Sequence, residues 1–451
     1  DGDKVDVNNQ PLLKTLRTNI EGIAGRMDVD LPINKSGRAR LMQYPRLIST
    51  GKSFAYYADR EIAGGSYKKK DFFFEIDPFR LDSLNSFSVQ SINWKGKLVS
   101  GGIFPDIPES IKVQDDLSLG FTTAAPTTGW DTYKGGGKYK GDVTLDYRGL
   151  TGKGDLTHLT SSMSSHQINF YLDSMIAIAD TFHIAKVSDG VKTPDVSSGG
   201  NRVFWKPKSD SMLIAMKDRP FSMYDNQTSL KGNLLLTSKG LKGNGALDWK
   251  EALLSSKEFN FKTDDMNADT AELNIKSEFG DKVTFKTPNV KAFVDFKNKQ
   301  ADFKSNLPNN PTEFAYNQYK TNIKEFKWDI EKKILDFRVP AGSAGEYFES
   351  TRASQLGLKF LSKRATYNLQ TSILRCEQVP SINVADALVV PDSGIVVIQA
   401  EAKMDQLKHA TILADTITKR HKIEDCTLDI ISKAELKGNG FFKYSCKDHT
   451  N

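Results

Sequence analysis

The stretch LKGNG occupies Leu241–Gly245 and recurs at Leu436–Gly440, and a near copy, LTGKG, stands at Leu150–Gly154. Residues 141–184 align with residues 232–275 without a gap, at an offset of 91 positions. The glycines that fall in register are Gly141, Gly149, Gly152 and Gly154 in one copy and Gly232, Gly240, Gly243 and Gly245 in the other. An ungapped match with its glycines in register indicates a duplicated structural unit.

Each copy is interpreted as one strand, a glycine-rich bend, a second strand and a third strand. Glycine has no Cβ, so its backbone can take a positive φ or approach a neighbouring strand closely. A phosphate-binding loop is the alternative, but such a loop needs a helix N-terminus directly after the glycines, and the pattern there is that of a strand. The glycines are therefore predicted to serve folding.

A third, shorter copy lies near the end of the sequence. Thr427–Tyr444 resembles Leu234–Trp249, with one inserted residue before the glycines. We therefore expect a piece cut from a longer repeating chain, or a chain that ends one strand into a repeat. The start at Asp1, without a methionine, favours a processed or truncated product, which fits an exported protein.

Alternation of apolar and polar residues dominates the sequence and predicts strands. It is clear at Phe72–Asp77, at Val290–Phe296 and at Phe326–Phe337, where Glu331–Lys333 is predicted to form a turn. One stretch, residues 12–23, instead spaces its leucines and isoleucines three or four apart, as a helix does. We predict an all-β fold in which repeated sheet units form an elongated β-solenoid or β-jellyroll-like architecture with little helix.

Three segments are expected along the chain. Residues 1–125 form a β-rich region with room for one short helix, residues 126–340 hold the duplicated units, and residues 341–451 form a solenoid-like region. In the last segment, small residues are expected at inward-facing positions: Ala385, Ala387, Ala400, Ala402, Ala410 and Ala414.

Composition argues against a nucleic-acid partner and against a membrane-spanning segment. Lys and Arg number 62 against 56 Asp and Glu, and the two signs are interspersed, so a solvated surface is favoured over a nucleic-acid interface. No run of about 18 apolar residues is present, so no transmembrane segment is predicted.

No pattern of catalytic, cofactor-binding or metal-ligating residues stands out, and we predict none of these sites and no enzymatic activity. The six histidines, His158, His166, His183, His409, His421 and His449, are scattered and are interpreted as surface or structural residues. Calcium at Asp264, Asp265 and Asp269, or at Asp173 and Asp180, is an alternative to a polar turn. Cys376, Cys426 and Cys446 are predicted to be free thiols, with a Cys426–Cys446 disulfide as the alternative.

Several stretches carry a resemblance to known proteins. Ser100–Pro105 (SGGIFP), Ser118–Phe121 (SLGF), Gly137–Leu156 and Asn169–Met175 (NFYLDSM) resemble large, uncharacterised cell-envelope proteins of Bacteroidetes-type bacteria, over about residues 60–451. More weakly, Ala268–Ala271 (ADTA) is similar to turns in the β-jellyroll repeats of lipopolysaccharide-transport proteins. The resemblance implies an exported protein of the periplasm or outer surface, and it supplies no catalytic residues.

Three functions follow as hypotheses. The first is a non-enzymatic scaffold or adhesive component of a bacterial envelope assembly, with other envelope proteins or further repeats of the same chain as partners. The second is a conduit for an envelope lipid or glycolipid, which requires a continuous apolar trough. The third is a carbohydrate-binding or polysaccharide-cleaving solenoid, which requires an exposed line of aromatic and acidic residues on one face. Trp130 and Trp205 are its candidates, although packing in the core is the commoner fate of a tryptophan.

Overall fold

The computed structural model describes residues 19–21, 25–28, 46–57, 65–82, 89–277, 280–307, 311–415, 417 and 421–443. The chain divides into two compact units. The first comprises Asp1–Val187, Val196–Arg219 and Leu235–Lys239, and the second comprises Ser188–Asp195, Pro220–Leu234 and Gly240–Asn451. The predicted segments 1–125, 126–340 and 341–451 stay a prediction.

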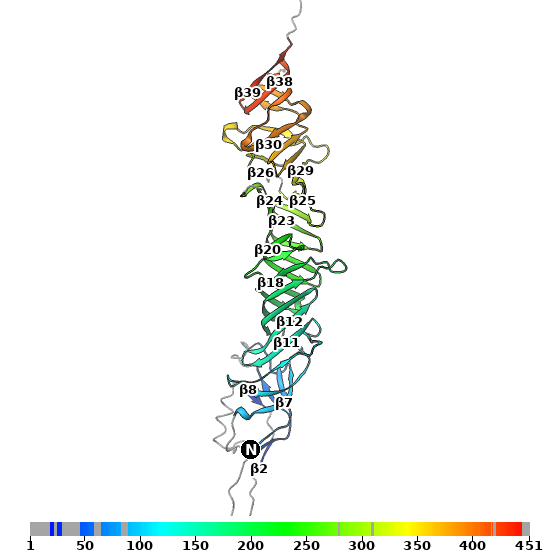
Figure 1. Cartoon of the computed structure of the whole chain (residues 1–451), viewed down its shortest axis with the longest axis vertical. Coiled ribbons are helices and arrows are strands. Elements are labelled where there is room, and N and C mark those ends of the chain that lie inside the picture. The colour runs from blue at the N-terminus through cyan, green and yellow to red at the C-terminus, as the bar shows by residue number, and fades with distance from the viewer. Residues whose placement is uncertain are drawn as a thin grey trace, which may run out of the picture. The chain divides into compact units, whose positions relative to one another are not determined.

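The all-β prediction is confirmed, since the regular elements of the described residues are strands and short 3₁₀ turns (Figure 1). The first unit contains β1 (Asn19–Glu21), β2 (Gly25–Asp28), β3 (Arg46–Ser49), β4 (Ser53–Tyr56), β5 (Phe73–Ile76), β6 (Arg80–Leu81), β7 (Asn93–Val99), β8 (Ile107–Val113), β9 (Leu119–Ala124), β10 (Trp130–Thr132), β11 (Gly137–Asp146), β12 (Gly149–His158), β13 (Ser161–Phe170), β14 (Met175–Ala179), β15 (Thr181–Ile184), β16 (Val196–Ser198), β17 (Asn201–Lys206) and β18 (Ser211–Ala215).

β20 (Thr228–Thr237) is divided between the units. The second unit further contains β19 (Phe221–Met223), β21 (Gly240–Trp249), β22 (Ala252–Phe261), β23 (Asp265–Ser277), β24 (Gly280–Asp295), β25 (Gln300–Ser305), β26 (Thr312–Phe314), β27 (Tyr319–Thr321), β28 (Glu325–Asp329), β29 (Ile334–Arg338), β30 (Glu346–Ser350), β31 (Lys359–Ser362), β32 (Arg364–Asn368), β33 (Ile373–Glu377), β34 (Ile382–Val384), β35 (Ala387–Val390), β36 (Val396–Ile398), β37 (Leu407–Ala414), β38 (His421–Ser432) and β39 (Glu435–Phe442). The 3₁₀ turns are η4 (Val89–Ser91), η5 (Pro207–Ser209), η6 (Ala353–Gln355), η7 (Asp392–Gly394) and η8 (Ala400–Ala402).

The helix predicted from the spacing of residues 12–23 is not found in the part of that stretch that the structure describes. Most of that stretch lies outside the described residues, and its described part, Asn19–Glu21, is strand β1, paired with β4. The pairing of β1 with an already extended neighbour supplies backbone hydrogen bonds that outweigh a short helical pattern.

The duplicated unit is confirmed strand by strand. β11, β12 and β13 begin and end 91 positions before β20, β21 and β22, so the sequence repeat is a repeat of three long strands. The glycines do not form a bend, however. Gly152 and Gly154 lie inside β12, and Gly243 and Gly245 lie inside β21; the chain reverses elsewhere, at residues 147–148 and 238–239.

At the glycines, the same irregularity occurs in both copies. The register between β12 and β13 shifts between Gly152 and Gly154, and that between β21 and β22 shifts between Gly243 and Gly245. In each case the third strand has one residue more than its partner at this point, which is a β-bulge. The recurring glycines therefore mark a bulge position rather than a turn.

Close approach of neighbouring strands explains why the second glycine of each motif is required. Gly154 pairs with Gly141, and a Cβ on Gly154 would lie 2.1 Å from the carbonyl oxygen of Lys140. A Cβ on Gly245 would lie 2.2 Å from the carbonyl oxygen of Lys231 in the same way. No side chain fits at these distances, so the sequence must place glycine there.

In the first unit, long strand β13 divides the sheet. Its C-terminal end pairs with β14, and its N-terminal end pairs with β15. Buried tyrosines join distant segments: the hydroxyl of Tyr67 donates to the carbonyl oxygen of Phe170 at 2.6 Å and accepts from the amide of Leu150 at 2.9 Å. The rings of Phe104 and Tyr139 pack on Phe170, with ring centroids 4.8 and 5.4 Å away.

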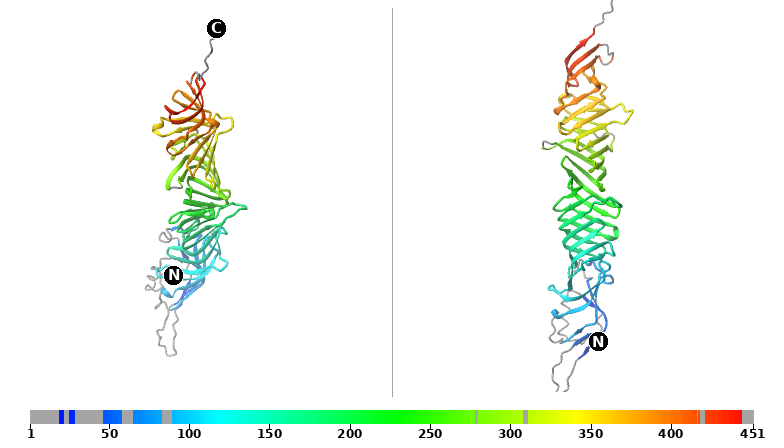
Figure 2. Two further views of the ribbon diagram at one scale, coloured as in Figure 1. Left: turned by 45° about the horizontal axis from the view of Figure 1, so that its top comes forward. Right: turned by 45° about the vertical axis from the view of Figure 1, so that its right-hand side comes forward.

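In the second unit, β24 divides the sheet in a similar way. Figure 2 shows the strands that follow it, coloured from yellow to red, in two further views. One ladder runs through β25, β28, β29, β32, β33 and β36, and the other runs through β26, β27, β30, β31, β34, β35 and β37 to β38 and β39. After β25 the chain alternates between the ladders, and all these pairings are antiparallel.

Aromatic rings fill the space between the two ladders. Phe314 of one ladder contacts Phe337 and Tyr367 of the other, with ring centroids 5.4 and 5.2 Å apart. The predicted inward row Val290, Ala292 and Val294 is fully buried, as the alternation requires. The predicted hairpin around Glu331–Lys333 is also confirmed, since Phe326 of β28 pairs with Phe337 of β29.

The small inward-facing residues expected after residue 381 are mostly wrong. Ala402 and Ala410 are buried, but Ala385 is exposed at a positive φ of 49°, and Ala387, Ala400 and Ala414 are only half-buried. The inward positions hold branched residues instead: Ile382, Val384, Val389, Val396 and Ile398. Around Ala385 and Ala387 the alternation could not assign the faces, because the strands there are three or four residues long.

Candidate functional site

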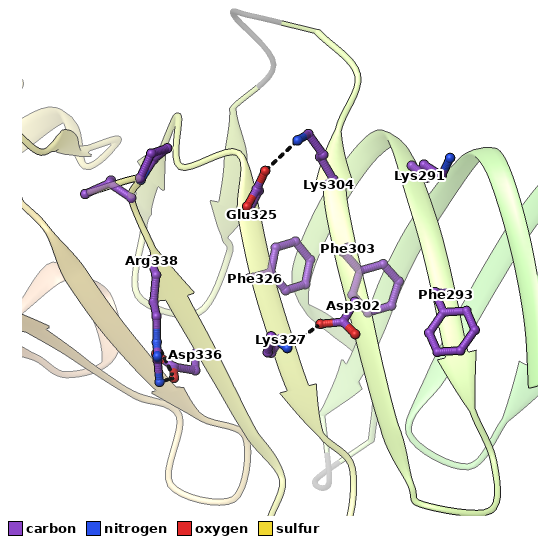
Figure 3. Close-up of a pocket in the computed structure, with 12 residues that line it drawn as sticks. Lys291, Phe293, Asp302, Phe303, Lys304, Glu325, Phe326, Lys327, Asp336 and Arg338 are labelled. Atoms are coloured by element: carbon purple, nitrogen blue, oxygen red, sulfur yellow. Dashed lines mark hydrogen bonds and ion pairs between the residues drawn. The ribbon is translucent and has the colours of Figure 1, made fainter. Parts of the chain in front are cut away.

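A groove of about 570 Å³ opens on the outward face of the second unit, over β24, β25, β28 and β29 (Figure 3). Its apolar element is Phe293, whose side chain is 40% exposed. Phe293 follows the buried Ala292 on β24, so the alternation turns its ring away from the core. A phenylalanine that remains exposed among charged neighbours is the informative feature of this face.

The strand register sets charged residues of opposite sign side by side around this ring. Asp302 stands opposite Phe293 on β25 and opposite Lys327 on β28, and its carboxylate lies 3.2 Å from the Lys327 ammonium. In the neighbouring row, the Lys304 ammonium lies 2.6 Å from the carboxylate of Glu325. Figure 3 shows Asp302 next to Phe293, and the Lys304–Glu325 pair further along the same two strands.

Asp336, on β29, lies at one end of the groove. Its carboxylate accepts hydrogen bonds from the guanidinium groups of Arg338 and Arg364. Burial alone would raise the pKa of Asp336, but these hydrogen bonds outweigh burial and lower it. The carboxylate is therefore held charged and fixed in place.

The groove can hold a neutral, polar ligand better than an ion. Its charged groups are already paired, so a free ion gains little there, whereas an exposed ring between hydrogen-bonding groups suits the apolar face and hydroxyls of a sugar. Sequence reasoning missed Phe293. The signal was present, because the alternation Val290–Val294 places residue 293 on the polar face.

The tryptophans named for glycan binding do not lie at this groove. Trp205 is fully buried, and its ring packs against His158 with a centroid distance of 4.6 Å. Trp130 is half-buried beside Phe104, with ring centroids 5.4 Å apart. The commoner fate of a tryptophan, packing in the core, is therefore the one found for Trp205, and the alternative of a stacking platform there is wrong, because β17 turns alternate residues into the core.

The aspartates considered for calcium have other partners. Asp180 contacts the ring of His166 at 2.7 Å, and Asp269 lies 3.2 Å from the ammonium of Lys291. The Asp265 carboxylate lies 4.0 Å from the ammonium of Lys262. In the described ranges, no group of three metal-ligating side chains comes together.

The histidines and cysteines are placed as follows. His158 is buried, and its ring contacts the carbonyl oxygen of Gly136 at 2.6 Å; burial lowers its pKa. His166, His183, His409 and His421 are exposed, and His449 lies outside the described residues. Cys376 and Cys426 are buried free thiols, and Cys446 lies outside the described residues, so the alternative disulfide is not tested.

Comparison with known proteins adds no neighbour: no family model, curated protein or solved structure matches this chain. Within the described part of the chain, no helix has the length and hydropathy of a membrane span.

Proposed function

We propose that this protein is a non-enzymatic scaffold or adhesive component of a bacterial cell-envelope assembly, built from repeated, antiparallel, jellyroll-like sheet units. One observation carries the proposal. The second copy repeats the strand lengths of the first, and the bulge at Gly152–Gly154 recurs at Gly243–Gly245. A chain that repeats one folding device extends a surface by adding units, which is the use that repeat proteins make of duplication. The envelope location rests on the resemblance of Gly137–Leu156 and its companion stretches.

The packing of the second unit favours the scaffold over the conduit. A lipid conduit needs an apolar trough between its sheets that stays open to the lipid. Here the inward rows contact one another, and Trp328, Phe337 and Tyr367 are each at most 1% exposed. A core filled in this way stabilises a rigid body.

Glycan binding is a second candidate, and the groove at Phe293 is the observation that favours it. A ring 40% exposed next to Asp302, with the pairs Asp302–Lys327 and Lys304–Glu325 on the two neighbouring strands, provides stacking and hydrogen bonds together. Phe293→Ala should abolish retention on a glycan array without changing the unfolding midpoint. Retention unchanged by this substitution would reject the groove as the glycan site.

Affinity capture of the native protein from gently solubilised envelopes tests the main proposal. Mass spectrometry of the captured proteins, lipids and glycans is the readout. Stoichiometric protein partners without enriched lipid or glycan support the scaffold. An enriched lipid without protein partners would move the assignment to the conduit.

A further inference from the structure

Another groove, of about 370 Å³, lies on the outward face of the first unit, over β9, β11, β12 and β13. Threonines, amides and charged groups surround Gly152 there, and no apolar side chain is among the described residues that line the groove. Its volume falls in the range of small-molecule sites, about 300–1,000 Å³. We call it the first-copy groove, because most of it is formed by the first copy of the repeat.

The β-bulge of the repeat turns extra side chains into this groove. A regular strand faces every second residue outward, but in β13 the neighbours His166 and Gln167 are both exposed. Both line the groove, together with Thr151 and Lys153 of the glycine motif on the facing strand β12. The motif that recurs along the chain therefore forms part of a candidate binding site in its first copy.

In the second copy, the equivalent side chains bond to one another. Three pairs form: Asn233 with Asn244 at 3.1 Å, Lys242 with Glu258 at 2.9 Å, and Asn260 with Asn267 at 3.2 Å. The polar groups on this face of the second copy are thus satisfied by neighbouring strands of the chain itself.

In the first copy, none of these three pairs forms. The offset of 91 positions makes the equivalent pairs Asp142 with Lys153, Thr151 with Gln167, and Asn169 with Ile176. Ile176 has no group that could bond to Asn169. Within the described part of the chain, the side-chain amides of Gln167 and Asn169 form no hydrogen bond, and Lys153 forms no ion pair. Groups that the second copy uses internally are therefore free to bind a ligand in the first copy.

Charge favours an uncharged ligand. Asp142 stands directly opposite Lys153 on neighbouring strands, so the two charges offset each other. Arg148 and His166 are each held by an aspartate of the chain. An ion would gain little from a groove in which no charge is in excess, whereas a ligand rich in hydroxyl groups can use the free donors and acceptors.

The row of polar side chains across the sheet favours a glycan over a peptide. It crosses four neighbouring strands in register: Thr122 of β9, Thr144 of β11, Thr151 of β12 and Asn169 of β13. One hydroxyl or amide is therefore presented about every 4.8 Å, which is close to the rise of one residue in an extended glycan. A peptide strand would need a free sheet edge, and β11 and β12 are each paired on both sides.

We propose that the first-copy groove binds an uncharged oligosaccharide that runs across the strands, with its hydroxyl groups hydrogen-bonded to Lys153, Gln167 and Asn169. This goes beyond the scaffold, which needs no such ligand. It is also independent of the groove at Phe293, which belongs to the second unit and whose charged groups are already paired.

A glycan array tests this proposal. The full chain, fluorescently labelled, is applied to cellohexaose, xylohexaose, mannohexaose and maltohexaose, with oligogalacturonate as the acidic counterpart. We expect saturable retention on at least one neutral hexasaccharide and none on oligogalacturonate. Asn169→Ala should weaken the binding of the retained hexasaccharide about tenfold in calorimetric titrations, because it removes a free amide from the groove.

A variant that copies the second repeat into the first gives the sharper test. Asp142→Asn, Lys153→Asn and Ile176→Asn, combined in one chain, restore two of the three internal pairs and should abolish retention. The unfolding midpoint should change little, because the same strands carry these residues in the second copy. Thr157→Ala, at an exposed position of β12 outside the groove, is the matched control and should leave binding unchanged.

Several results would overturn the proposal: no retention on any neutral hexasaccharide, stronger retention on oligogalacturonate, or full binding by the combined variant. Binding that is lost in Phe293→Ala and kept in Asn169→Ala would assign the glycan to the other groove instead. Failure here is separate from failure of the scaffold. Protein partners captured by a chain that retains no glycan would leave the scaffold standing, whereas glycan retention by a chain without protein partners would do the reverse.

Discussion

Replacing Gly245 by alanine should locally unfold the second copy of the repeat. Gly245 has a φ of 122°, and a Cβ there would lie 2.2 Å from the carbonyl oxygen of Lys231 and 2.8 Å from the Cα of Gly232. Two separate costs therefore combine: strain in the backbone of the substituted residue and overlap with the neighbouring strand. Gly240 of the same strand separates them, because its φ is 136° and no atom lies within 4 Å of the Cβ position.

The magnitudes follow from these two costs. Alanine at a positive φ in the extended range costs about 1–3 kcal/mol in either variant. Overlap with backbone that must shift costs about 1–3 kcal/mol more, and this second cost applies to Gly245→Ala alone. The gain from restricting the unfolded chain is the same for both substitutions, so it cancels in the comparison.

Hydrogen exchange measured by mass spectrometry on peptides from β20, β21 and β22 provides the assay, because it reports local opening within a long chain. Exchange in Gly245→Ala should exceed that in Gly240→Ala by about 5- to 150-fold, which corresponds to the second cost. Equal acceleration in the two variants would refute the reasoning, since it would mean that the close approach of the strands contributes nothing.

Three further outcomes are expected. Phe261→Ala should lower the free energy of unfolding by about 3–5 kcal/mol in urea titrations, because this ring is 2% exposed and packs on Gly243, whereas the exposed Phe293→Ala should cost less than about 1 kcal/mol. The pKa of Asp336 is lower in the folded chain than in the unfolded chain, so its stabilising contribution is present above about pH 4 and is lost as the pH falls through the lowered value. Asp336→Asn should therefore reduce the acid-dependent shift of the urea unfolding midpoint. An unchanged shift would count against this contribution. Burial raises the pKa of the Cys376 thiol, so iodoacetamide should label Cys376 only after unfolding, and rapid labelling of the native chain would contradict its burial.

The sequence predicted the local features of this fold because they depend on neighbouring residues. Alternation at Val290–Phe296 assigns each side chain to a face, and the 91-residue offset carries the bounds of three strands from one copy to the other. The exposed ring of Phe293 follows from the same alternation, although only the structure shows that an ion pair, Asp302–Lys327, lies beside it.

The sequence could not predict features that depend on pairing between distant residues. The Gly243–Gly245 motif was interpreted as a bend because its strand partner, Gly232, cannot be identified from local pattern. Trp205 was proposed as a binding platform because burial depends on β14, which pairs with its strand. The division of β24 between two ladders is likewise decided by which later strands reach it.

The alternation of hairpins between two ladders has a consequence for the order of folding. Each new pair of strands needs only strands that precede it closely in the sequence; the pairing of β29 with β32, for example, joins Ile334 to Asn368. Contacts between residues so close in the sequence lose little conformational entropy when the loop between them closes, and they therefore form early. The second unit can therefore grow hairpin by hairpin while the chain is being synthesised, without waiting for its last strand.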